Sequence, residues 1–120
     1  MKSTELRLGN YVQTDKHIHQ VTRLNQFTIN NKPEWYYSPV ELTGELLLKC
    51  GLIVNGILYE KGRFAIKKWK VGDDIEWVIF WEDKAILYKK PYYLHELQNL
   101  YFALTGEELK IDIQSYQFKK

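Results

Sequence analysis

The C-terminal third of the chain carries the pattern that most constrains its fold, an amphipathic helical repeat followed by a stop signal. Large apolar side chains recur there at steps of three and four residues, which places them along one side of a helix. They are Leu94, Leu97, Leu100, Tyr101 and Leu104. Gly106 follows where a helix would end in a left-handed cap. The spacing therefore predicts a helix over about residues 93–105, and the segment contains no recognisable reactive group.

Runs typical of β-strands fill the preceding forty residues. They cover residues 53–60, 63–71, 75–81 and 84–89, and short pairs of Gly, Asp, Glu or Lys separate them. Such spacing indicates an antiparallel sheet. The third run is apolar at both alternating sets of positions, which is typical of a central strand covered on both faces. We expect the helix of residues 93–105 to cover one of these faces.

The N-terminal third predicts a small meander. Residues 11–14 and 17–24 read as a β-hairpin, and residues 26–29 as a third extended run. Thr43 is a candidate N-cap for a short helix over about residues 43–50, which Gly51 would end. Residues 109–113 are expected to add a last strand.

These patterns together predict a single α+β domain over residues 1–120. Its length of 120 residues falls in the usual range of about 100 to 150 for one domain. We expect an antiparallel sheet of about five to seven strands with one C-terminal amphipathic helix, about 93–105, and one short helix, about 43–50. The N-terminal hairpin could alternatively curl into a small SH3-like barrel, an idea that rests on analogy.

Composition narrows the class of protein. Seventeen basic against fifteen acidic residues give a net charge of +2, too small for the strong field of a dedicated nucleic-acid binder. The single Cys50 excludes an internal disulfide, and the first residues lack the apolar core of a signal peptide. The longest apolar runs are far shorter than the ~20 residues that span a bilayer. We therefore expect a cytoplasmic protein that does not enter a membrane.

Two segments resemble a known family. Glu5–Val12 reads ELRLGNYV, and His95–Leu109 contains LQNLYFALTGEEL, with a looser match over Leu42–Gly51. They are similar to segments of small uncharacterised proteins from gut Bacteroidetes and their phages or mobile elements. That family has no assigned activity, so the resemblance implies no functional residue. It implies a cytoplasmic, phage-related origin.

Candidate reactive groups are few. Cys50 and His95 could act as nucleophile and base, but a thiol at a helix C-terminus is not activated, so we expect a buried, inert Cys. His17 and His19 alternate on a strand and could begin a zinc site, although no second tight pair of ligands follows. We therefore expect no catalytic residue, no metal and no cofactor. Scattered carboxylates could still converge in the fold.

A basic and aromatic group of residues suggests a nucleic-acid contact. Cations can neutralise phosphates, and aromatic rings can stack on bases. The candidates are Arg63, Lys67, Trp69, Lys70, Lys89 and Lys90. On a strand, Lys67 and Trp69 share one face while Lys70 lies on the other, which divides the patch. An edge strand guarded by lysines gives the same composition.

A second group of aromatic residues suggests a protein contact. Trp35, Tyr36 and Tyr37 lie in a predicted loop, and Phe102 falls off the apolar stripe of the helix. Aromatic residues are enriched in interaction hot spots. Burial of the helix on two sides would explain Phe102 equally well.

The sequence favours a non-catalytic protein-interaction or accessory factor, encoded by a prophage or mobile element, with an unknown protein partner. A nucleic-acid-binding protein that uses the basic and aromatic strand patch is the alternative, and an unrecognised enzyme comes third. Monomer and homodimer both remain open.

Overall fold

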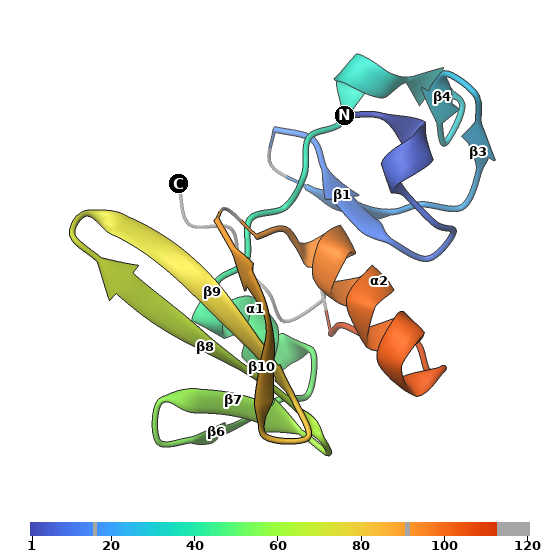
Figure 1. Ribbon diagram of the computed structural model, residues 1–120. Coiled ribbons are helices and arrows are strands. Elements are labelled where there is room, and N and C mark those ends of the chain that lie inside the picture. The colour runs from blue at the N-terminus through green and yellow to red at the C-terminus, as the bar shows by residue number, and fades with distance from the viewer. Residues whose placement is uncertain (16, 91, 113–120) are drawn as a thin grey trace. The chain divides into compact units, whose positions relative to one another are not determined.

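The structure, a computed structural model, describes residues 1–15, 17–90 and 92–112 (Figure 1). The described chain divides into two compact units. The first contains residues 1–41 and 93–108, and the second contains residues 42–92 and 109–112. Both units combine helix with antiparallel strands, so the predicted α+β class is confirmed. The prediction of one domain over residues 1–120 stays a prediction.

The second unit is built on a five-stranded antiparallel sheet with the strand order β10-β9-β8-β7-β6. The strands are β6 (Ile53–Asn55), β7 (Leu58–Lys61), β8 (Phe64–Val71), β9 (Asp74–Trp81) and β10 (Lys84–Lys89). The predicted run over 53–60 is wrong in one respect, because it contains two strands. Gly56, at φ 63°, and Ile57 form a two-residue turn between them. Apolar residues continue through this turn, so its sequence resembles a single strand.

The middle of β9 is buried on both faces, as predicted for a central strand. Trp77 and Ile79 point to one face and Val78 to the other, and all three are buried. The register pairs Ile66 of β8 with Ile79 and Lys67 with Val78. Trp77 and Ile79 thus share a face with Ile66, which is also buried. We call this side of the sheet the core face.

The short helix α1 (Gly44–Lys49) begins and ends as its sequence predicts. The Thr43 hydroxyl accepts a hydrogen bond from the Leu46 N–H at 3.1 Å, which caps the helix. Leu46 and Leu47 are fully buried. After the helix, the chain leaves through Gly51 at φ 86°.

Residues 109–112, for which a strand was predicted, form none; Ile113 lies outside the described residues. Leu109 and Ile111 are nevertheless buried. The Asp112 N–H donates a hydrogen bond to the Lys49 carbonyl at 3.0 Å. The alternation of apolar residues in this segment therefore reflects a buried extended chain beside the end of α1, without a strand ladder.

The first unit holds two small sheets. β1 (Tyr11–Gln13) pairs with β2 (Ile18–Gln20), which confirms the first hairpin, and a second sheet has the order β3-β4-β5. Its strands are β3 (Leu24–Asn25), β4 (Thr28–Ile29) and β5 (Lys32–Pro33). Short 3-10 helices, η1 (Ser3–Glu5) and η2 (Glu34–Tyr36), precede and follow these sheets. Their shared core consists of Leu6, Val12, Val21, Ile29 and Tyr37.

The predicted C-terminal helix is α2 (Leu94–Thr105), and Gly106 at φ 76° ends it as expected. It belongs to the first unit, and its predicted packing on the five-stranded sheet stays a prediction. Its buried side also differs from the predicted apolar stripe. His95 and Gln98 are buried, while Leu100 and Leu104 are only half-buried.

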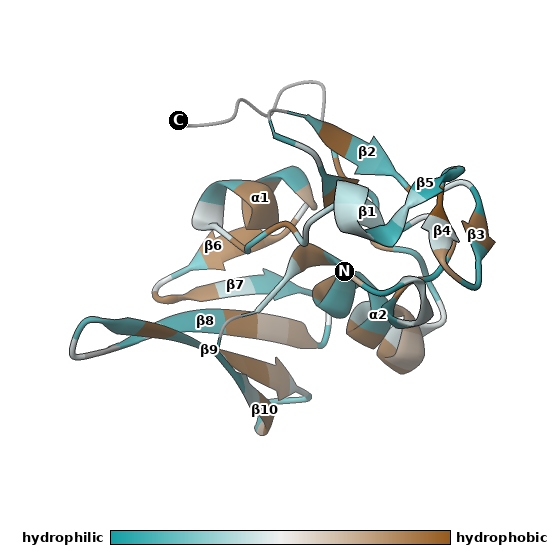
Figure 2. Ribbon diagram, turned by 90° about the horizontal axis from the view of Figure 1, so that it is seen from above, coloured by the Kyte–Doolittle hydropathy of each residue, from teal (hydrophilic) through white to brown (hydrophobic). Residues whose placement is uncertain are grey.

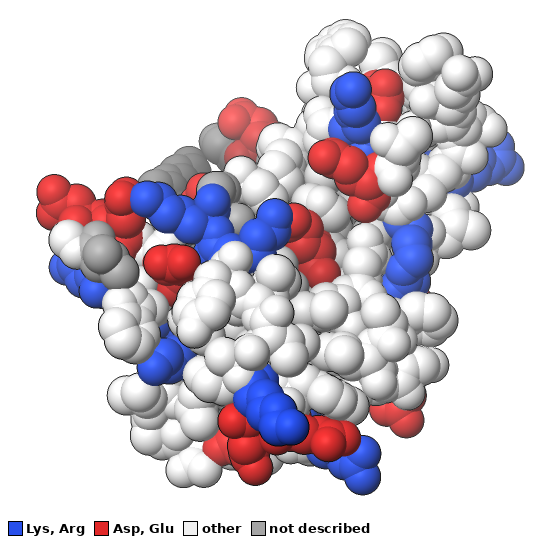
Figure 3. All heavy atoms as spheres, viewed as in Figure 1, with Lys and Arg blue, Asp and Glu red and all other residues white. Residues whose placement is uncertain are grey.

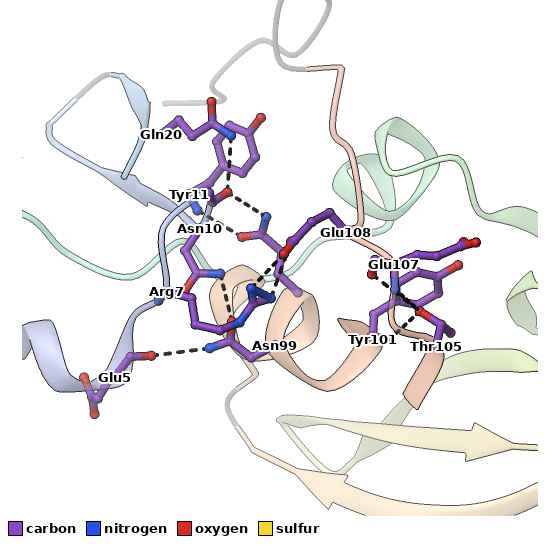
Figure 4. A network of polar contacts seen from close by, with 12 residues as sticks. Glu5, Arg7, Asn10, Tyr11, Gln20, Asn99, Tyr101, Thr105, Glu107 and Glu108 are labelled. Carbon is purple, nitrogen blue, oxygen red and sulfur yellow. Dashed lines mark hydrogen bonds and ion pairs between the residues drawn. The ribbon is translucent and has the colours of Figure 1, made fainter. Parts of the chain in front are cut away.

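A polar network explains why a glutamine is buried on this helix (Figure 4). Gln98 is 1% exposed, and its Oε1 accepts a hydrogen bond from the Tyr11 N–H at 2.9 Å. Its Nε2 donates to the Gly9 carbonyl at 3.2 Å. Asn10, fully buried, donates through Nδ2 to Asn99 Oδ1 at 2.9 Å. These amides hold the turn before β1 against α2.

None of the helices in the described part of the chain is long and apolar enough to span a membrane.

Candidate functional site

The first unit contains a series of aromatic rings that runs from its core to its surface. The Tyr37 ring lies edge-on to His19 at 5.8 Å and to Tyr36 at 5.1 Å between ring centroids. Tyr36 in turn meets Trp35 at 6.3 Å, also edge-on. Tyr37 is only 6% exposed, whereas Trp35 is 79% exposed. The inner rings therefore hold the outer ones in place at the protein surface.

Phe27 is a further exposed aromatic residue, in the turn between β3 and β4. Ser3 links this turn to η2: its hydroxyl donates to the Gln26 carbonyl at 2.9 Å, and its N–H donates to the Glu34 carboxylate. The two segments that carry Phe27 and Trp35 are thus tied to the same buried serine. We call Phe27, Trp35 and Tyr36 the aromatic end. Sequence reasoning missed Phe27 because residues 26–29 read as one strand.

The predicted protein-contact residues fall into three environments. Trp35 and Tyr36 are exposed, as a contact surface requires. Tyr37 is buried in the core cluster, so its assignment to that surface was wrong. Phe102 is exposed on α2, and the Arg7 guanidinium lies 4.4 Å from its ring centroid. That arginine also pairs with Glu108 at 2.8 Å, so Phe102 belongs to a different contact.

The five-stranded sheet presents a second aromatic surface on the side opposite its core face. The register aligns Lys67 of β8 with Val78 of β9, and Val78 with Tyr88 of β10. Trp69 and Phe80 lie two residues further along their strands on the same side. The Lys67 ammonium lies 4.4 Å from the Trp69 ring centroid and 5.9 Å from that of Phe80. We call Lys67, Trp69, Val78, Phe80 and Tyr88 the aromatic face.

The other residues predicted to contact nucleic acid do not combine with the aromatic face to form a basic surface. Arg63 pairs with Glu82 at 3.0 Å, and Lys90 pairs with Asp74 at 2.5 Å. Lys70 lies opposite Ile75, on the other side of the sheet from Lys67, and so does Lys89, opposite Trp77. The division of the patch that alternation predicts is therefore confirmed. Figure 3 likewise shows blue and red atoms next to one another over the sheet strands.

Carboxylates also border the aromatic face. Glu60 lies opposite Ala65, and Glu76 lies opposite Trp69, both on the same side of the sheet as Lys67. One lysine flanked by two glutamates is a poor site for a phosphate backbone. The geometry of this surface suits stacking better than phosphate neutralisation.

The contacts of the cysteine and of the three histidines are of a structural kind. Cys50 is buried at the end of α1, and burial raises the pKa of its thiol to about 12 although Lys61 acts in the opposite direction. His95 lies in the other unit, stacked on Tyr93 with ring centroids 6.0 Å apart. The rings of His17 and His19 are 6.2 Å apart, and Nε2 of His19 hydrogen-bonds the Thr14 hydroxyl at 2.9 Å. Within residues 1–15, 17–90 and 92–112, no three His, Cys, Asp or Glu side chains form a group that could hold a metal.

A shallow hollow lies at the hairpin ends of β7–β8 and β9–β10. Its volume is about 450 Å³, and Glu60, Arg63, Glu82 and Asp83 contribute its charged groups. Arg63 is already engaged with Glu82. The hollow is therefore open to solvent, and two of its charged groups are already paired with each other.

Comparisons with models of known protein families, with curated proteins and with solved structures gave no match for this chain.

Proposed function

We propose that the chain is a non-catalytic protein-interaction module and that the aromatic end is its contact surface. The observation that carries the proposal is the 79% exposure of Trp35 on a short helix, with its ring linked through Tyr36 to the buried Tyr37. Tryptophan and tyrosine dominate hot spots because they supply large contact area. A ring already held in place also loses less conformational entropy on binding than a mobile one.

The residues around Trp35 indicate what kind of partner would bind there. Lys32 lies 5.6 Å from the Tyr36 ring centroid, and Glu34 is engaged with Ser3. Phe27, Trp35 and Tyr36 therefore present apolar area with a cation at one margin. This arrangement favours a protein partner with an apolar pocket, bound with little dependence on salt.

Affinity capture from a lysate of the source cells tests the proposal when variants of two tryptophans are compared with the wild type. Trp35→Ala removes the most exposed ring of the aromatic end, and Trp69→Ala removes one exposed ring of the aromatic face. We expect a partner that survives nuclease treatment, is lost with Trp35→Ala and is retained with Trp69→Ala. Equal recovery with both variants would contradict the assignment of the contact surface.

Single-stranded nucleic-acid binding by the aromatic face is the second candidate function. The placement of the Lys67 ammonium over the Trp69 ring, with Tyr88 exposed nearby on the same face, supports it. Stacking of bases on aromatic rings adds roughly 1–3 kcal/mol per base. The two flanking glutamates make it the weaker candidate.

Lys67→Glu and Lys68→Glu form a matched pair for this second candidate. Both exchange one lysine for glutamate in β8, but only Lys67 lies on the aromatic face. Binding of a labelled thymine oligonucleotide should weaken much more with Lys67→Glu. Equal weakening by both variants would indicate a non-specific charge effect.

A further inference from the structure

The two edges of the five-stranded sheet differ in a way that predicts how a second copy would join it. Edge strands expose N–H and C=O groups that can pair with another strand, and proteins guard them by keeping them very short or with lysines, prolines or bulges. β10 has Lys84 and Lys89 at its ends and an irregular register between Ala85 and Leu87. β10 is therefore a guarded edge.

β6, the opposite edge, is only three residues long but carries no lysine, proline or bulge. Its residues Ile53, Val54 and Asn55 contain no charged side chain and no proline, and their register with β7 is regular. Ile53 is 72% exposed, and Ile57 in the following turn is 73% exposed. Figure 2 shows hydrophobic colour at β6 and at this turn. Only the shortness of the strand limits pairing.

The hairpin geometry determines which amides of β6 face outward. The Gly56–Ile57 turn has two residues, so Asn55 and Leu58 are the closing pair that exchanges hydrogen bonds with the neighbouring strand. Val54 is the next position, and its N–H and C=O point away from β7. An open hollow of about 560 Å³ lies over the β6–β7 hairpin, lined by all three residues of β6 together with Gly51, Gly62, and Glu60 and Lys61 of β7.

We infer that β6 pairs with β6 of a second copy of this chain, antiparallel and centred on Val54. This register is self-complementary, since it places Val54 opposite Val54 and Ile53 opposite Asn55 of the second copy. No like charges meet along the strand, whereas two β10 edges would bring lysine against lysine.

The same difference between the edges limits the assembly to two copies. A pair that uses β6 from both copies leaves only the β10 edges at the ends of a continuous ten-strand sheet. Their lysines and irregular register oppose further addition. The β6 contact is isologous and closes on itself, so a dimer forms without a filament.

Sedimentation velocity on the full chain, from about 1 µM to about 1 mM, tests the inference. We expect the wild type to pass from monomer to dimer as concentration rises. Val54→Lys places two ammonium groups at the symmetry axis and should raise the dissociation constant at least tenfold. Ile86→Lys is the matched control, because it adds the same charge to an exposed position on the other edge. It should leave dimer formation unchanged.

A cysteine at the symmetry axis gives an independent readout. A hydrogen-bonded antiparallel pair has Cα atoms about 5.5 Å apart, within the range that a disulfide bridges. Val54→Cys should therefore form a covalent dimer on mild oxidation, while Ile86→Cys should not. Circular dichroism checks that each variant is folded. A wild type that stays monomeric up to about 1 mM, or Val54→Lys dimers as stable as the wild type, would overturn the inference.

Discussion

At the scale of single residues, the most informative side chain is a buried glutamine on the longer helix. Gln98 occupies a position where an apolar residue would be expected, and its amide satisfies the Tyr11 N–H and the Gly9 carbonyl. A buried backbone group that loses its hydrogen bond costs roughly 1–3 kcal/mol. The glutamine thus contributes to stability through backbone groups distant in sequence.

Gln98→Leu should lower the free energy of unfolding by roughly 1–3 kcal/mol in urea titrations, because it removes both hydrogen bonds from a buried site. Gln20→Leu is the matched control. Gln20 also donates to the Gly9 carbonyl, at 3.4 Å, but its side chain is exposed. It should change stability by about 0.5 kcal/mol or less. Similar losses for both variants would show that burial does not set the cost.

Cys50 predicts a pH dependence of stability. Burial raises its pKa from the usual 9.0 to about 12, with Lys61 lowering it in part. Above pH 9 the unfolded chain releases this proton while the folded chain keeps it. The contribution of the protonated thiol is complete below pH 9 and is lost as the pH rises toward 12.

Between pH 9 and pH 10, stability should therefore fall faster in the wild type than in Cys50→Ala, by up to about 1.4 kcal/mol per pH unit. All other ionisable groups are the same in the two proteins, so the difference between their curves isolates the contribution of Cys50. Denaturant unfolding at several pH values measures it. Parallel curves for the two proteins would mean that the thiol is not protected by the fold.

Residue-level prediction succeeded where local chemistry decides and failed where distant segments meet. Burial of Cys50 and the Thr43 cap followed from helix-end signals. The burial of Gln98 did not, because its acceptor and donor lie nearly ninety residues away in the chain. Tyr37 was misplaced because three consecutive aromatic residues do not reveal which ring turns inward.

At the scale of elements, the Tyr59 side chain of β7 reaches the first residue of α1. A Cβ atom at Gly44, the first residue of the helix, would lie 2.5 Å from Tyr59 Oη. Such a distance forces one of the two groups to move. The absence of a side chain at Gly44 therefore leaves room for the Tyr59 hydroxyl.

Gly44→Ala should destabilise the protein by up to about 1 kcal/mol, because the atom that must move is at the far end of the Tyr59 side chain. Tyr59→Phe removes the clashing hydroxyl and leaves the Cζ atom as the nearest neighbour at 3.3 Å. The double variant should therefore recover part of the lost stability in thermal melts. Additive losses in the double variant would contradict the proposed contact.

Elements were predicted well where turn residues interrupt an apolar pattern. Gly72 and Gly106 marked a strand turn and a helix end. The turn at Gly56 was missed because Ile57 continues the apolar run on its far side. The turns at Asn30–Asn31 and Glu82–Asp83 have positive φ angles without glycine, and their composition indicated a turn without giving its conformation.

At the scale of the whole molecule, the described part of the chain passes between the two units three times, near residues 41, 92 and 108. Neither unit is a continuous segment, so each needs distant parts of the chain to form. Helix α2 supplies the first unit with residues that follow the entire sheet of the second. This connectivity favours cooperative folding.

Scanning calorimetry should accordingly show one unfolding transition, with equal calorimetric and van't Hoff enthalpies. This result would support the prediction of a single domain over residues 1–120. Two resolved transitions would show that the units unfold separately.

Binding of a protein by the aromatic end is tested by comparing nuclease-treated captures of wild type and Trp35→Ala with quantitative mass spectrometry. Trp35 is largely exposed, so its truncation should leave the fold intact while removing a binding hot spot. We expect at least one protein to be recovered roughly tenfold less, or not at all, with the variant. Identical sets of proteins at equal abundance would contradict it.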